Sequence, residues 1–121
     1  MTAVFINPQL YVQKNDKFTT GIVYMPIALA YLVAHFKSHN IKTQLLDLFG
    51  SSPKICTEEN GSLVFGKKID ELNLKDLNNA KCFFVYANQV ANHLSVVEII
   101  KYLKKIPKHS CFRSWKLTSC Y

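Results

Sequence analysis

The chain has 121 residues, which is room for one domain and excludes a second, catalytic one. Apolar residues make up 49% of it and charged residues 19%, proportions that argue against disorder, collagen and coiled coil. Fifteen Lys and Arg residues against eight Asp and Glu residues give a net charge of +7, and the excess lies in the second half of the chain.

The basic excess does not by itself predict a nucleic-acid partner. Only Arg113 among the cations is Arg, whereas bidentate contacts to phosphates and bases favour Arg over Lys. The only clusters of lysines are a pair and a helically spaced group that is typical of a solvated helix face. These lysines are Lys67 and Lys68, and then Lys101, Lys104, Lys105 and Lys108. Nucleic acid is therefore the least favoured partner.

Cysteine usage and the apolar segments indicate a cytoplasmic protein with free thiols. The four cysteines form no Cys-x-x-Cys pair and no Cys/His cluster, so no metal site is predicted. Nothing at the start of the chain resembles a signal peptide. The longest apolar stretch, Ile22 to Phe36, is shorter than the roughly 20 residues that a membrane span needs. We therefore expect a buried helix there and no membrane partner.

The first apolar segment, residues 2–7, is rich in strand-forming residues and stops at Asn7-Pro8. It predicts a central strand that ends in a turn. A polar stretch follows from Gln9 to Thr20.

The second apolar segment, Ile27 to Phe36, predicts a helix, because Pro26 before it suits a first helical turn. The helix should end near residues 38–40. Since it is apolar nearly all round, we expect it to pack on a sheet with one side and to be largely covered on the other.

Residues 42–49 predict a second strand, closed by a turn at residues 50–53. Strand, helix and strand within about fifty residues form a βαβ unit, so the sheet should be parallel. The stretch from 51 to 81 is less regular: Gly61 to Gly66 suggests a small extended piece, and apolar residues from Ile69 to Leu77 suggest one or two short helices.

Residues 81–87 form the clearest strand pattern, apolar on both faces as in a buried parallel strand. From His93 to Lys105 the pattern is that of an amphipathic helix, capped by Asn92 or Ser95 and ended by Pro107. Its apolar face is predicted to consist of Leu94, Val97, Ile100 and Leu103, with Ile99 and Tyr102 beside them.

These elements predict the α/β class, with a Rossmann-like (flavodoxin-like), doubly wound parallel sheet that is incomplete after its third strand. We expect one partial domain over residues 1–107. A fourth parallel strand should follow Pro107. Residues 108–121 instead differ in composition and predict an irregular C-terminal tail, so we interpret the chain as truncated. A third strand left at the edge would be open to pairing.

Three segments together resemble the N-terminal cobalamin-binding domain found ahead of the radical S-adenosylmethionine (radical SAM) barrel. They are Val4-Phe5-Ile6-Asn7-Pro8, Pro26-Ile27-Ala28-Leu29-Ala30-Tyr31-Leu32 and Leu45-Leu46-Asp47-Leu48-Phe49-Gly50. The resemblance covers residues 3 to about 106 and implies a cobalamin-binding module of a radical SAM enzyme. It also implies that Ala87-Asn88-Gln89 stands where the third strand of that family delivers a loop to the corrin.

The chain departs from the family in ways that limit its chemistry. Gln9 and Ala28 replace a frequent Pro and a frequent Gly, and the Asp-x-His-x-x-Gly motif that gives cobalt a histidine in some relatives is absent. The Cys-x-x-x-Cys-x-x-Cys of the iron–sulfur cluster is also absent. The cluster and S-adenosylmethionine would belong to a missing downstream domain, so we expect no catalysis by this chain alone and cobalamin that is at most weakly held.

Physical reasoning independent of any family places the site at one edge of the sheet. Open α/β sheets bind ligands beyond the carboxyl ends of their strands, where the strand order reverses. Side-chain amides at that edge could bind the peripheral amides of a corrin, although they could equally just cap the strand ends. The candidate cofactor-binding residues are Asn7, Pro8, Ala87, Asn88 and Gln89, with Asp47 at the same edge.

The alternative is an α/β interaction domain without a cofactor. In that hypothesis the edge of the third strand recruits a second copy or another chain by strand addition. No nucleophile, base and orienting group occur together in the sequence, so no catalytic residue is assigned.

Overall fold

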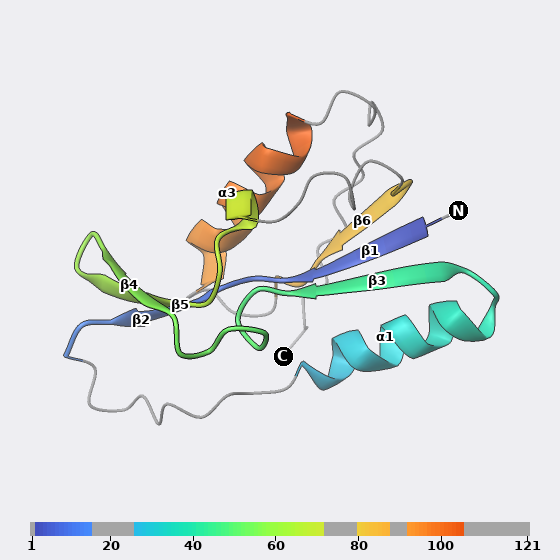
Figure 1. The fold of residues 1–121 in the computed structure, drawn as a ribbon, viewed down its shortest axis with the longest axis horizontal. Helices are drawn as coiled ribbons and strands as arrows, with labels where there is room; N and C mark the ends of the chain where they lie inside the picture. Colours follow the sequence, from blue (N-terminus) through green and yellow to red (C-terminus); the bar gives the residue numbers. More distant parts are fainter. Residues whose placement is uncertain (1, 16–25, 72–79, 88–91, 106–121) are drawn as a thin grey trace.

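The structure, a computed structural model, describes residues 2–15, 26–71, 80–87 and 92–105 (Figure 1). Its content is mixed α and β, with one parallel and one antiparallel sheet. The predicted α/β class is therefore confirmed. Residues 72–77 of the predicted short-helix region and the tail from 108 to 121 lie outside the described residues.

The parallel sheet has three strands in the order β3-β1-β6. They are β1 (Thr2–Asn7), β3 (Lys42–Asp47) and β6 (Cys82–Val85). β1 lies in the middle, and its residues from Ala3 to Ile6 are fully buried. The three predicted strands and their parallel pairing are confirmed. β6 differs from the expectation in one respect: its residues are only half-buried, because it lies at the end of the described strand order.

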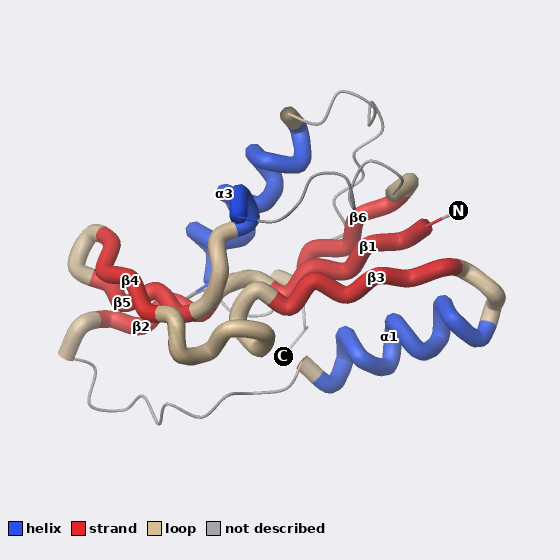
Figure 2. The backbone as a smooth tube through the Cα atoms, in the orientation of Figure 1, coloured by secondary structure: helices blue, strands red, loops and turns tan. Residues whose placement is uncertain are grey.

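Helix α1 (Ile27–Ser38) covers one face of this sheet (Figure 2). Leu29 packs on Ala3 and Phe5, and the ring of Phe5 stacks on Phe84 with centroids 4.8 Å apart. Phe36 meets both rings edge-on. This aromatic contact fixes the helix on the sheet through packing and ring geometry.

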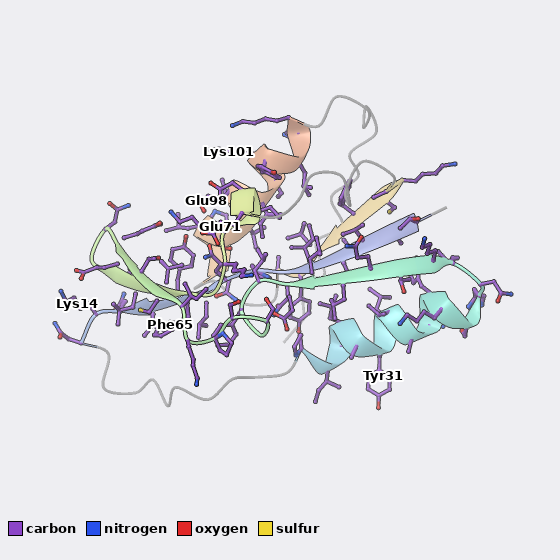
Figure 3. All side chains as sticks on the ribbon, viewed as in Figure 1. Lys14, Tyr31, Phe65, Glu71, Glu98 and Lys101 are labelled. Atoms are coloured by element: carbon purple, nitrogen blue, oxygen red, sulfur yellow. The ribbon has the colours of Figure 1, made fainter. Side chains whose placement is uncertain are left out.

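The expected cover over the outer side of α1 is absent among the described residues. Ile27 is 62% exposed and Tyr31 is 74% exposed, and the ring of Tyr31 points away from the sheet (Figure 3). Leu29 is the buried residue of the helix. The prediction of a helix covered on both sides was wrong: a helix that is apolar all round still has only one face on the sheet.

Helix α3 (His93–Lys104) lies on the opposite face of the sheet (Figure 1). Its buried residues are Ser95, Ile99 and Leu103, whereas Leu94 is 57% exposed. The predicted apolar face is confirmed at Ile99 and Leu103 and was wrong at Leu94. The proposed cap also differs: Asn92 stands at the N-cap but its side chain makes no capping hydrogen bond.

The second sheet is antiparallel, and most of it was missed from the sequence. Its order is β2-β5-β4, with β2 (Leu10–Gln13), β4 (Cys56–Glu59) and β5 (Ser62–Phe65). Only the segment at β5 was predicted as extended. Asn60 and Gly61 join β4 to β5 with φ values of 51° and 78°, the conformation of the two-residue turn that Asn-Gly favours.

The two sheets are linked by continuous chain, since β2 follows β1 after Pro8 and Gln9. A single turn of 3-10 helix, η1 (Ile69–Glu71), comes after β5 and buries Ile69 beside α3. It accounts for the start of the predicted short helix. Among the described residues, no helix has the length and apolar character needed to cross a bilayer.

Candidate functional site

The carboxyl ends of the three parallel strands meet at one edge of the sheet (Figure 1). Asn7 at the end of β1 lies opposite Asp47 at the end of β3. On the other side of β1, the amide N–H of Tyr86 donates to the carbonyl oxygen of Ile6 at 2.9 Å, so Ala87 follows at the same edge. The structure therefore brings Asn7, Asp47 and Ala87 to the edge where ligands of open α/β sheets bind.

The carboxylate of Asp47 is held in one orientation. Its Oδ1 accepts hydrogen bonds from Asn7 Nδ2 at 2.8 Å and from the backbone N–H of Gly50 at 2.8 Å. Within the described part of the chain, both side-chain hydrogen bonds of Asp47 fall on Oδ1. The other oxygen, Oδ2, therefore keeps its capacity to accept a hydrogen bond from a ligand.

Gly50 belongs to this arrangement, although the sequence indicated only a turn there. A Cβ added at Gly50 would collide with Oδ2 of Asp47 and lie 2.8 Å from its Cγ. Any other residue at position 50 would displace the carboxylate. The Asp-x-x-Gly spacing was the available signal, because an Asp side chain often accepts from a backbone N–H a few residues ahead in a turn.

Pro8 and Gln9 lie inside the fold. The side chain of Pro8 is fully buried, so any effect of Pro8 on a ligand would come through the position of the backbone. Gln9 is 2% exposed: its N–H donates to Ser95 Oγ at 3.0 Å, and its Nε2 donates to the carbonyl oxygen of Gly66 at 3.1 Å. Gln9 thus joins the end of β1 to α3 and to the end of β5.

The third-strand loop is only partly described. Ala87 is half-buried, whereas the candidates Asn88 and Gln89 lie outside the described residues. Ser95, the alternative cap of α3, accepts the hydrogen bond from Gln9, and no bond from its hydroxyl to the first turn is among those described.

The start of α3 holds a second acceptor that sequence analysis missed. Oδ1 of Asn92 is buried and has no hydrogen-bond partner among the described residues. Such atoms are rare, because each costs about 1–3 kcal/mol when its hydrogen bond to water is lost without replacement. Ser95, three residues later, contacts the residue that follows Pro8, so this part of α3 lies near the carboxyl end of β1.

No protein-family model, curated protein or solved structure matches the chain. The resemblance to the cobalamin-binding domain rests on the sequence segments alone.

Proposed function

We propose that this chain is a cobalamin-binding module of the kind found in radical SAM enzymes, and that it holds the corrin at the carboxyl edge of the parallel sheet. The observation that supports this best is the oriented carboxylate of Asp47, with Oδ2 left to accept a hydrogen bond at that edge. The peripheral amides of a corrin are N–H donors and match such an acceptor.

The strand order is compatible with this proposal. The chain places its first strand between the second and third parallel strands and puts one helix on each face. In the proposal this is the beginning of a Rossmann-like (flavodoxin-like), doubly wound sheet. The order reverses between β1 and β6, and that is where such sheets hold flat cofactors such as flavin.

Each edge residue has a stated role in the proposal. Asp47 accepts from a corrin amide, Asn7 and Gly50 keep its carboxylate in place, and Ala87 lets the backbone approach the ring closely. Asn88 and Gln89 remain proposed donors and acceptors of the third-strand loop. Cobalamin would supply cobalt–carbon chemistry, while the iron–sulfur cluster and S-adenosylmethionine would bind in a downstream barrel.

The direct test is titration of the purified chain with hydroxocobalamin, followed by desalting and visible spectroscopy. We expect retention near one equivalent by the unsubstituted chain. Asp47→Ala should abolish retention, and so should Asn88→Ala combined with Gln89→Ala. Asp70→Ala, at an exposed carboxylate on η1, is the matched control and should retain cobalamin.

Circular dichroism shows whether a chain that retains no cobalamin is folded. If the unsubstituted chain is folded and retains no cobalamin, the proposal is wrong. It is equally wrong if Asp47→Ala, shown to be folded, retains as much cobalamin as Asp70→Ala does.

The exposed apolar side of α1 supports a second candidate, an interaction domain without cofactor. Ile27 and Tyr31 lie one turn apart on α1 and are both largely exposed. From Ile27 to Ala34 the helix carries no charged residue. Such an uncharged apolar surface can pack on the same surface of a second copy around a two-fold axis. It carries no charge that would favour a different partner of opposite charge.

Light scattering tests this second candidate. A dimer that becomes a monomer in Tyr31→Lys, while Lys37→Ala remains a dimer, would support self-association through α1. A monomer at all concentrations would exclude it and would leave the cobalamin proposal untouched.

A further inference from the structure

Two histidines lie one turn apart at the C-terminal end of α1, far from the carboxyl edge of the sheet (Figure 1). His35 and His39 are both exposed, and their ring centroids are 4.5 Å apart. Two imidazoles bound side by side to one ion, with metal–nitrogen distances of about 2.0–2.1 Å, hold their ring centres roughly 4.5–5 Å apart. The observed separation therefore suits chelation with little movement.

The Nδ1 atom of His39 lies 2.9 Å from the carbonyl oxygen of His35 and 3.2 Å from Ser38 Oγ. In the tautomer that donates from Nδ1 to this carbonyl oxygen, the neutral ring has its free electron pair on Nε2. Metal-binding histidines are commonly oriented in this way, with one ring nitrogen donating to a backbone carbonyl and the other bound to the ion.

The carbonyl group of His35 is free to accept side-chain hydrogen bonds because it lies at the end of the helix. The carbonyl of His35 belongs to the last turn, where carbonyls lack helical partners, and it accepts from His39 and from Ser38 Oγ at 2.7 Å. Carbonyls at a helix C-terminus also carry partial negative charge, which favours a cation. Lys37 is two residues from each histidine, which places it on the far side of the helix.

We infer that His35 and His39 form a two-histidine site for a late first-row divalent metal ion. Imidazole nitrogens suit Ni²⁺, Cu²⁺ and Zn²⁺ rather than Mg²⁺ or Ca²⁺. Among the described residues no group of three or more His, Cys, Asp and Glu side chains could hold a metal. Within the described ranges the pair therefore has no third protein ligand, and the proposed site is open to water or to a further ligand. It is independent of the proposed cobalamin site.

The test uses untagged protein and NiCl₂, followed by calorimetry and by broadening of backbone amide signals in nuclear magnetic resonance. We expect one ion to bind, with broadening centred on residues 35–40. His35→Ala and His39→Ala should each weaken binding by about tenfold or more, since the second imidazole on the same helix acts at high effective concentration.

A matched variant keeps the number of histidines but breaks their spacing. Combining Ala34→His with His35→Ala moves one ring about 100° around the helix and should weaken binding as much as His35→Ala does. His93→Ala, at the exposed start of α3, should leave binding unchanged. The inference is overturned if the shifted pair binds as the natural pair does, if His93→Ala removes binding, or if the folded chain binds no nickel.

Discussion

At the scale of single residues, Gly66 is the position where the backbone leaves least freedom. Its φ is 109°, and a Cβ there would collide with the carbonyl oxygen of Leu48 and lie 2.9 Å from the Cα of Phe49. The N–H of Gly66 donates to Ile55 at 2.9 Å, and its carbonyl accepts from the side chain of Gln9. The positive φ and the lack of space for a Cβ both require glycine at this position, and the two backbone hydrogen bonds hold it in place.

Gly66→Ala should therefore lower the free energy of unfolding by about 3 kcal/mol or more, through left-handed strain added to overpacking. Gly61→Ala is the control, because Gly61 has φ 78° but no atom within 4 Å of the added Cβ. It should cost only about 1 kcal/mol. Urea unfolding followed by circular dichroism measures both, and equal losses would contradict this account.

At the scale of elements, sequence composition predicted the parallel strands and both helices because each is a continuous apolar or amphipathic segment. The antiparallel sheet was missed because β4 is mostly polar and β2 has only four residues next to a polar stretch, and because their pairing with β5 is a tertiary property. The Asn60-Gly61 turn was the one local signal for it.

The face of α3 was misjudged for a related reason. The polar residue Ser95 lies on the buried side because the N–H of Gln9 needs an acceptor there, a contact between residues 86 positions apart. Hydrophobic periodicity cannot reveal such a contact. The same holds for the site: the edge residues followed from strand ends, whereas the orientation of Asp47 and the buried oxygen of Asn92 did not.

Leu94 and Leu103 both belong to the face predicted for α3, and their burial indicates which of the two stabilises the fold. Leu103 is 1% exposed in the cluster around Val4 and Ile6, so Leu103→Ala should cost about 2–5 kcal/mol of unfolding free energy. Leu94→Ala, at a residue 57% exposed, should cost less than about 1 kcal/mol. Thermal and urea unfolding of the two variants measure the difference. A larger loss from Leu94→Ala than from Leu103→Ala would contradict the burial of these two residues.

At the scale of the whole molecule, several groups make the fold sensitive to alkali. Burial, with a smaller effect from Glu98, raises the pKa of Tyr11 above its ordinary value of 10.0. Burial also raises the pKa of Tyr102, and the hydrogen bond to Glu59 raises the pKa of Lys68 above 10.5. Each group holds its proton more tightly in the folded state than in the unfolded one.

Stability should therefore be complete below the ordinary pKa values of these groups and should fall as pH rises through the folded ones, from about pH 9.5 upward. Urea unfolding at a series of pH values from 8 to 11 measures the slope. Tyr11→Phe should make the decline shallower. A stability that rises with pH over this range would show that the stated causes are wrong.

The central position of β1 has a consequence for how the chain is made. Ala3 pairs with Thr43 and with Cys82, so its two neighbours in the sheet lie 40 and 79 residues further along the chain. At ribosomal rates of about 5–20 residues per second, the second neighbour is synthesised roughly 4–16 s after β1. Throughout that interval the most deeply buried strand of the finished protein has an unpaired, apolar edge, which is the form of a nascent chain most open to aggregation and to chaperone binding.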